Sequence, residues 1–252
     1  MKTKYLLFCF CCFLLATSHA QIPKPDKIKT PEGTLTIQPI THGSLVLSFN
    51  NKTIYVDPHG GKERYKGLAA PDIILITDIH EDHTDKETLK NIDTKNATFV
   101  VPQAVADILQ EDYSSQLTVI KNGEMGAVKD VFINAIPMYN LPESDDAMHP
   151  KGRGNGYFLN FGGKGIYISG DTEDTPEMRA LQNIDIAFVC MNLPYTMDIN
   201  QAADAVLAFK PKIVYPYHYR GKSDMSDTKA FKKLVNDKDK SIEVRLKNWY
   251  KE

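Results

Sequence analysis

The chain is poor in cysteine, and most of the few it has lie at one end. Three of the four cysteines, Cys9, Cys11 and Cys12, fall within the first twenty residues, and only Cys190 follows them. One remaining cysteine excludes an internal disulfide, so an exported form of the chain must be stabilised by an ordinary hydrophobic core. Cys190 lies in the apolar run IAFVCMN, which predicts a buried core residue rather than a ligand or a nucleophile.

The chain also lacks a hydrophobic run that would span a bilayer comfortably. The run from Tyr5 to Ala16 is shorter than the roughly 20 apolar residues that a membrane span needs. Lys2 and Lys4 precede it and Ser18-His19-Ala20 follows it, which is the pattern of a secretory signal peptide. We therefore predict a cleaved signal peptide over residues 1–20 and a periplasmic or secreted protein without stable membrane insertion. An uncleaved signal that anchors the chain in the membrane is the minor alternative.

Neither sign of charge is in large excess. The chain has 30 Lys and Arg residues and 32 Asp and Glu residues, and leaving out Lys2 and Lys4 changes its formal net charge from −2 to −4. Proteins that bind nucleic acid usually carry a concentrated basic excess, so the net charge gives only a weak argument against nucleic acid as a partner. A small-molecule substrate is expected from the hydrolase activity that the motifs below imply. The basic stretch KAFKKLVNDKDK is diluted by Asp237 and Asp239, which is typical of a solvated helix face.

The organisation of the chain predicts one domain after a short spacer. Residues 21–33 contain three prolines among lysines, which predicts an extended spacer, and the domain should occupy residues 34–252. Strands are expected over LTIQPI, SLVLSF and TIYVDP as an antiparallel meander, and then over DIILIT, TFVVP, LTVI, VFINAIP, YFLNF, GIYIS, DIAFVCM and KIVYPY.

Helices are expected between many of these strands, over DKETLKNI, QAVADILQEDY, PEMRALQNI, INQAADAVLAF and from Thr228 onward. The polar stretch from Leu141 to Gly156 has no apolar period and predicts a long loop, which is often a functional element. Strands with helices interspersed in both halves favour an α/β fold of two mixed β-sheets face to face with helices outside, an αββα sandwich.

Three of the apolar runs end in histidine or aspartate. PDIILIT leads into the turn at residues 78–83, Asp-Ile-His-Glu-Asp-His, while GKGIYIS leads into Gly170-Asp171-Thr172 and PKIVYPY into His218. If these strands lie in packed sheets with their C-terminal ends at one rim, their Asp and His side chains meet around one point. Divalent metals prefer such oxygen and nitrogen ligands, so the pattern predicts a metal site.

The same residues carry a resemblance to a known family. The chain resembles the metallo-β-lactamase superfamily, whose signature is His-x-His-x-Asp-His, a later His, a Gly-Asp aspartate that bridges two metals, and a final His. Within this superfamily it more closely resembles the branch that contains ascorbate-phosphate lactonase and related metal-dependent hydrolases of unknown substrate. In chain order, the segments that carry the resemblance are Thr41-His42-Gly43-Ser44, Tyr55-Val56-Asp57-Pro58, residues 78–83, Ser169-Gly170-Asp171-Thr172, Leu193-Pro194-Tyr195-Thr196-Met197 and Pro216-Tyr217-His218-Tyr219.

The resemblance implies one complete metal site and one altered site. The complete one, called the second site below, comprises Asp82, His83, Asp171 and His218. Asp171 would bridge the metals and Asp82 would orient the attacking water, so these two are the expected catalytic carboxylates. At the first site His80 is present, but Asp78 replaces the usual first histidine. Met138-Tyr139-Asn140 stands where a third histidine is usual.

His149 is the candidate to complete the first site, because it lies in the 141–156 loop and could fold back over the rim. An exposed loop position is an equally weighted alternative. A third alternative is that His149, Lys151 or Arg153 contacts an anionic group of the substrate. An oxygen-richer first site shifts the preference from zinc toward manganese, so both metals stay open.

The implied activity is that of a metal-dependent hydrolase, in which a metal-activated water attacks a small ester, lactone or phosphoester. Asp57 is expected to orient a metal ligand by hydrogen bonding, and His42 to be structural or to orient a ligand. The leading hypothesis has two metals. The alternatives are a mononuclear hydrolase that uses the second site alone and a metal-stabilised binding protein without catalysis. The sequence leaves the substrate and the oligomeric state open.

Overall fold

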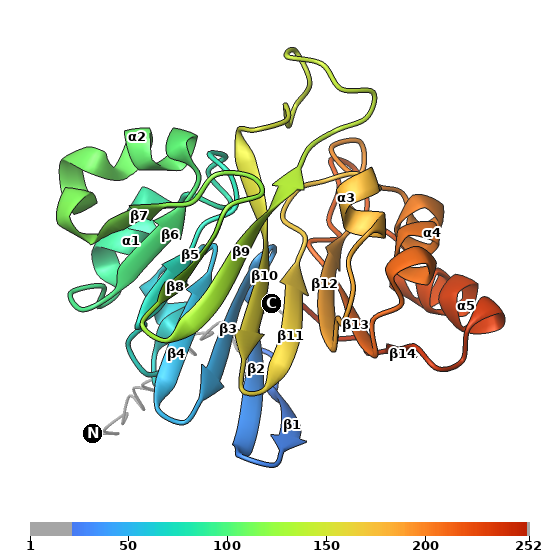
Figure 1. Cartoon of the computed structure of the whole chain (residues 1–252), viewed down its shortest axis with the longest axis horizontal. Coiled ribbons are helices and arrows are strands. Elements are labelled where there is room, and N and C mark those ends of the chain that lie inside the picture. Colours follow the sequence, from blue (N-terminus) through green and yellow to red (C-terminus); the bar gives the residue numbers. More distant parts are fainter. Residues whose placement is uncertain (1–21, 251–252) are drawn as a thin grey trace, which may run out of the picture.

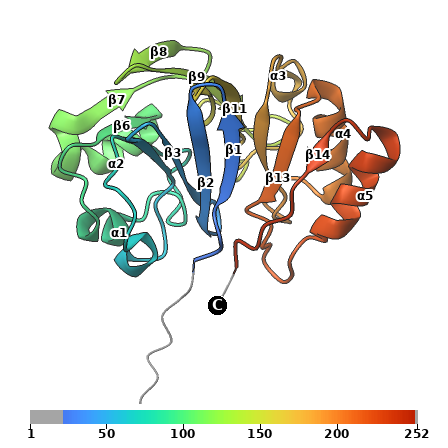
Figure 2. The ribbon, with the colours of Figure 1, turned by 90° about the horizontal axis from the view of Figure 1, so that it is seen from below.

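Two β-sheets packed face to face form the centre of the molecule (Figure 1). The computed structural model describes residues 22–250, so the predicted signal peptide lies outside the described residues. Each sheet has seven strands, and helices lie on the outer side of both sheets (Figure 2). This arrangement confirms the expected αββα sandwich.

The first sheet is built from the N-terminal half of the chain. It starts as an antiparallel meander through β4 and continues with parallel strands, and its members in spatial order are β1 (Asp26–Thr30), β2 (Gly33–Thr41), β3 (Ser44–Phe49), β4 (Lys52–Val56), β5 (Ile73–Leu75), β6 (Thr98–Val101) and β7 (Leu117–Val119). The predicted N-terminal meander is confirmed.

The second sheet repeats this plan with the C-terminal half. Antiparallel strands again come first and parallel strands follow, in the spatial order β8 (Met125–Val128), β9 (Val131–Met138), β10 (Gly154–Phe161), β11 (Lys164–Ile168), β12 (Ile186–Cys190), β13 (Ile213–Tyr217) and β14 (Glu243–Val244). Parallel strands place their carboxyl ends at the same edge of a sheet, which is where the sequence predicts the metal ligands.

The helices flank the sheets in two groups. The first sheet is covered by α1 (Lys86–Asn91) and α2 (Gln103–Tyr113), and the second by α3 (Pro176–Arg179), α4 (Ile199–Phe209) and α5 (Thr228–Lys238), with short 3₁₀ turns at Lys62–Tyr65 and Ser114–Gln116 (Figures 1 and 2). Asp198 caps α4 through a capping box with Gln201, as the sequence indicates. Among residues 22–250, no helix is both long and apolar enough to cross a membrane.

The side chains on the two faces of the buried strands belong to two different hydrophobic clusters. In β4, Ile54 and Val56 point into the core between the sheets, whereas Tyr55 packs toward the helices of the first sheet. Successive side chains of a strand point to opposite faces, so a strand that is buried on both faces reads as a continuous apolar run. Cys190 is fully buried at the end of β12, as predicted for a core residue.

Several local expectations are corrected by the structure. Residues 21–33 are not only a spacer, because β1 forms within them and pairs antiparallel with β2. Strand β8 was not expected, and it pairs with β9 at the edge of the second sheet. The helix expected over residues 176–184 ends at Arg179, because the chain turns through a left-handed Asn183 (φ 58°) to enter β12. The expected loop is also shorter, since β10 already begins at Gly154.

Candidate metal centre

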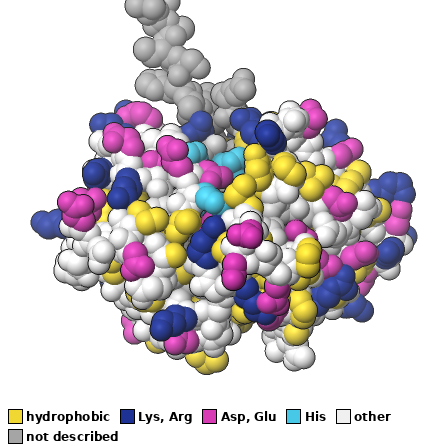
Figure 3. All heavy atoms as spheres, turned by 90° about the horizontal axis from the view of Figure 1, so that it is seen from above, with side chains coloured by type: hydrophobic (Ala, Val, Ile, Leu, Met, Phe, Trp, Pro, Cys, Tyr) yellow, Lys and Arg dark blue, Asp and Glu magenta, His cyan; other side chains and the backbone are white. Residues whose placement is uncertain are grey.

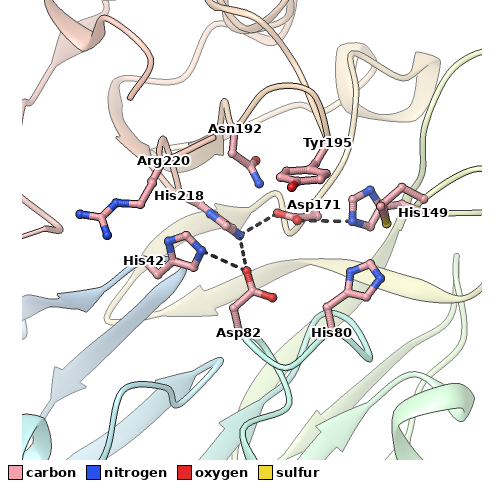
Figure 4. A pocket seen from close by; sticks show the side chains of 10 residues that line it. His42, His80, Asp82, His149, Asp171, Asn192, Tyr195, His218 and Arg220 are labelled. Carbon is pink, nitrogen blue, oxygen red and sulfur yellow. Dashed lines mark ion pairs between the residues drawn. The ribbon is translucent and has the colours of Figure 1, made fainter. Parts of the chain in front are cut away.

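The ends of β5, β11 and β13 meet at one rim of the sandwich, as the sequence predicts. His83 lies in the turn after β5, Asp171 follows β11 and His218 follows β13. Nε2 of His218 is 3.2 Å from Oδ1 of Asp171 and 3.3 Å from Nε2 of His83, and Nε2 of His83 is 3.5 Å from Oδ2 of Asp171. Figure 4 shows Asp171 between His218 and His149, in the middle of the site.

Asp57 fixes the orientation of His83 from behind. Its Oδ2 lies 2.8 Å from Nδ1 of His83 and 2.6 Å from the hydroxyl of Thr77, and its Oδ1 accepts the Thr77 backbone N–H at 2.8 Å. A carboxylate only accepts hydrogen bonds, so Nδ1 of His83 carries a proton, and Nε2 is the ring nitrogen directed at the site. The structure thus places Asp57 in the orienting position that was expected.

Asp82 is the second-site carboxylate that is most open to the cavity. Its side chain is 31% exposed, and its Oδ2 lies 3.3 Å from Nε2 of His218 and 3.8 Å from Nε2 of His83. Nε2 of His42 approaches the same oxygen at 3.1 Å, and Nδ1 of His42 lies 2.8 Å from the Tyr250 hydroxyl. His42, Asp82 and His218 form a candidate ligand group of their own, so His42 is closer to the chemistry than a purely structural role implies.

The first site is assembled from Asp78, His80 and His149. One ligand atom of each lies within 4.8 Å of the others, and Nδ1 of His80 is 2.8 Å from Oδ2 of Asp78. Nε2 of His149 is 3.9 Å from Oδ2 of Asp78 and 3.3 Å from Oδ2 of Asp171. Asp171 therefore stands between the two sites, where a bridging ligand is expected.

His149 is held in the site by Asn140. The Oδ1 atom of Asn140 accepts the backbone N–H of His149 at 2.8 Å and lies 3.1 Å from its Nδ1, which leaves Nε2 directed at Asp171. The alternative of an exposed loop histidine is wrong, because His149 is only 1% exposed. In the sequence Asn140 stands only where a histidine is usual, and its contacts with His149 depend on how the loop folds.

The structure places Lys151 and Arg153 beside acidic side chains of the same chain. Lys151 lies 3.0 Å from Glu143 and 3.1 Å from Glu177, and Arg153 forms a two-point ion pair with Asp78. Neither side chain lines the cavity above the metal centre. Acidic partners from this chain pair with both cations, and the substrate contacts expected of them stay a prediction.

Left-handed backbone conformations aim several of these side chains. His42, Asp57 and His218 have φ values of 54°, 41° and 44°, in a region that side-chain-bearing residues rarely adopt. Gly170 has φ 61°, and a Cβ on it would lie 2.4 Å from the Met138 sulfur. Such conformations concentrate at functional sites, where the surrounding fold holds them against their strain.

The charges of the site are set by burial and by neighbouring groups. Burial raises the pKa of Asp171 and of Asp82, but the histidines beside them, His218 and His83 in both cases, lower it far below the ordinary value. Burial lowers the pKa of His42 to about 4, although Asp82 opposes the shift. At neutral pH the carboxylates are therefore ionised and His42 is neutral, which are the forms that bind cations. Burial lowers the pKa of His83, but Asp171 and Asp57 raise it well above its ordinary value, so a cation that binds at Nε2 of His83 displaces a proton.

The donor set fits divalent metal ions. Nε2 of His149 and Oδ1 of Asp171 are buried and make no hydrogen bond with the described residues. Nε2 of His83 and Nε2 of His218 face each other at 3.3 Å. Nδ1 of His83 is not available to the site, because it donates its hydrogen bond to Asp57. Buried polar atoms are normally satisfied, so lone pairs that converge in this way are accounted for by cations bound between them.

A cavity of about 260 Å³ lies above these side chains. Besides the candidate ligands it is lined by Met148, Asn192, Tyr195 and Arg220, and Met148 is 49% exposed. Figure 3 shows histidines at this surface next to acidic and hydrophobic side chains. Tyr195 was expected only as part of a family motif, and Met148, Asn192 and Arg220 were not expected at the site, because no local pattern marks residues that a loop brings to a cavity.

Loss of the Asp57 carboxylate is expected to weaken metal binding without unfolding the protein. In Asp57→Asn the amide can no longer fix the His83 proton at Nδ1 as a carboxylate does, so we expect affinity for Zn²⁺ to fall about 10- to 100-fold. Competition with a chromophoric chelator measures the change. The exposed Asp130→Asn is the matched control, and equal affinities in the two variants would contradict the orienting role.

Comparisons with known proteins agree with this centre. Residues 36–218 match the family model for the β-lactamase superfamily domain. A UPF0173 metal-dependent hydrolase of Pyrococcus abyssi is 32% identical over 180 residues, which cover 69% of this chain and 78% of that relative. A solved structure from Parabacteroides distasonis, provisionally named a metal-dependent hydrolase, shares 39% identity with a TM-score of 0.78 and covers 89% of this chain and 98% of its own.

Similarity to a more distant solved structure identifies the fold. YhfI of Bacillus subtilis, a metallo-β-lactamase fold protein, is 11% identical with a TM-score of 0.62, and the match covers 82% of this chain and 88% of that one. This similarity concerns the fold alone, and it identifies the αββα sandwich as the metallo-β-lactamase fold. The finer resemblance to the ascorbate-phosphate lactonase branch stays a prediction from the sequence.

Proposed function

Because the chain belongs to the UPF0173 metal-dependent hydrolase family of the β-lactamase superfamily, we propose that it is an exported hydrolase of a small ester, lactone or phosphoester. The observation that carries the proposal is the convergence of buried His and Asp donor atoms on Asp171, directly beneath a cavity. One or two divalent ions fit these groups, with zinc and manganese as the candidates.

In the proposed reaction the metal would activate the water, and the side chains would position the water and the metal ligands. A divalent ion bound in such a site makes water nucleophilic at neutral pH and polarises the bond under attack. Asp82 is ionised and partly open to the cavity, so it can accept a hydrogen bond from the attacking water and orient it. Asp171 holds His149 and His218 on its two oxygens, and Asp57 keeps His83 in one tautomer.

The cavity supports a small substrate. Its volume of about 260 Å³ lies just below the roughly 300–1,000 Å³ that is usual for small-molecule sites. Asn192 and Arg220 offer polar contacts, and the exposed part of Met148 offers an apolar one. The acidic net charge, and the acids Asp237 and Asp239 that dilute the basic stretch KAFKKLVNDKDK, support the proposal that nucleic acid is not the substrate. The proposal of export rests on the sequence of residues 1–20.

An activity screen tests the proposal. The protein is expressed from the full-length chain, stripped of metal, reloaded with Zn²⁺ or Mn²⁺, and assayed on lactone, acyl-ester, phosphomonoester and phosphodiester substrates. We expect at least one class to be cleaved by the loaded protein and not by the stripped protein or by His218→Ala. A wild type that binds metal but hydrolyses none of the classes would favour a metal-stabilised binding protein instead.

A further inference from the structure

Asp78 is a fully buried carboxylate that a single arginine holds at both oxygens. Nε of Arg153 donates to Oδ1 at 3.1 Å and Nη2 donates to Oδ2 at 2.9 Å. This two-point geometry is the strongest form of arginine–carboxylate pairing, and Arg153 itself is only 20% exposed. The negative charge of Asp78 is therefore neutralised within the protein.

The oxygen that Asp78 directs toward the first site is already engaged twice. Nδ1 of His80 lies 2.8 Å from Oδ2, the same atom that accepts from Nη2 of Arg153. A carboxylate oxygen has two lone pairs, so both lone pairs of Oδ2 are directed at nitrogen atoms. Asp78 can ligate a metal only by giving up part of this arrangement.

Arg153 also places a positive charge inside the first site. Its Nη2 is 3.5 Å from Nε2 of His80, so a divalent ion held by Asp78 and His80 would lie close to a guanidinium and be repelled by it. Within residues 22–250, no lysine or arginine forms an ion pair with the second-site carboxylates Asp82 and Asp171. Arg220, the cation that lines the same cavity, stacks on the Tyr250 ring at 4.4 Å, and Asp57 adds a negative charge behind His83.

The backbone around Arg153 holds its side chain close to Asp78. Arg153 directly precedes β10, and its Nη2 donates to the Met148 carbonyl at 2.6 Å, which ties the loop to the ion pair. A Cβ on Gly154 would lie 2.9 Å from the Thr77 carbonyl and 3.3 Å from Oδ1 of Asp78, so glycine is required for this approach. A buried aspartate needs a paired cation, whereas the histidine that the family pattern has at position 78 needs none.

We propose that Arg153 takes the place of a first-site metal as the cation that neutralises Asp78. The resting protein then holds one tightly bound divalent ion, at the second site, and takes up another only weakly at the first. This inference rests on the proposed metal centre, and it assigns Arg153 a role as a positioning residue that makes the two sites unequal.

Mn²⁺ titration of the stripped full-length protein tests this inequality. We expect the wild type to retain one Mn²⁺ per chain after gel filtration and to show the electron paramagnetic resonance spectrum of an isolated ion. In Arg153→Met the charge of Asp78 is unpaired, so the first-site affinity should rise by about tenfold or more and a spin-coupled Mn²⁺ pair should appear. Lys151→Met, which removes a cation of the same loop that contacts only Glu143, Glu177 and Tyr139, should match the wild type.

A double variant covers the case in which an unpaired Asp78 prevents folding. Asp78→His with Arg153→Met removes both charges and should hold two Mn²⁺ ions with similar affinity. The inference would be overturned if the wild type retained a coupled pair, or if Arg153→Met and the double variant folded but retained no more metal than the wild type. Either result would leave the proposed hydrolase intact. A wild type that binds no Mn²⁺ and no Zn²⁺ would defeat the proposed metal centre itself.

Discussion

Asp171→Asn is expected to abolish hydrolysis and to remove most of the bound metal, because Asp171 is the residue that both sites share. Its two oxygens lie 3.2 Å from Nε2 of His218 and 3.3 Å from Nε2 of His149, and an amide nitrogen in place of one oxygen cannot ligate. The loss should exceed the roughly 10- to 100-fold that removal of a supporting partner costs. Metal content by mass spectrometry and the rate on the substrate found in the screen measure both effects.

Asp185→Asn is the matched control for this substitution. Asp185 is also a partly buried carboxylate with two cationic partners, Lys164 and Lys212, but it lies just before β12, at the end of the strand opposite the rim. Circular dichroism should show both variants folded. If Asp171→Asn kept its metal and its rate, Asp171 would not be the central ligand and the proposed centre would have to be abandoned.

Trp249→Ala is expected to give the largest loss of stability. Trp249 is the only tryptophan of the chain, it is fully buried, and it packs edge-on against Phe188 and Tyr217. Its indole N–H donates to the Ser44 carbonyl at 3.1 Å, which leaves a buried acceptor unpaired when the ring is removed. Truncating such a side chain costs about 3–5 kcal/mol of unfolding free energy. Urea unfolding followed by circular dichroism measures the change.

Trp249→Ala should also disturb the metal centre, and two control variants test whether the loss of stability is specific to this side chain. Trp249 precedes Tyr250, whose hydroxyl lies 2.8 Å from Nδ1 of His42, so the variant should also disturb His42. Trp249→Phe should lose less stability, because it keeps an aromatic ring in the core. Phe132→Ala, at a position that is 38% exposed, should stay within about 1 kcal/mol of the wild type. Equal losses in Trp249→Ala and Phe132→Ala would refute the anchoring role.

Local patterns were enough for most elements and for the meeting of Asp and His side chains at the strand ends, whereas the ligand set of the second site was implied by the family resemblance. Short runs rich in Val, Ile and Tyr marked the central strands, since a strand buried on both faces must be apolar throughout. The ligands Asp171 and His218 follow such strands directly, so their meeting point could be inferred from chain direction alone. Strand β8 was missed, because its sequence, Met-Gly-Ala-Val, is exposed at alternate positions and carries no strong strand signal.

The sequence by itself determined the fold class, the single cysteine in the core and the histidine and aspartate ligands at the strand ends, because these depend on periodicity and on residues adjacent in the chain. Tertiary structure alone decided the first site. His149 is buried there by Asn140, and Arg153 is paired with Asp78 across 75 residues of chain. Interactions over such separations depend on which loop folds over the rim, and no local pattern records that choice.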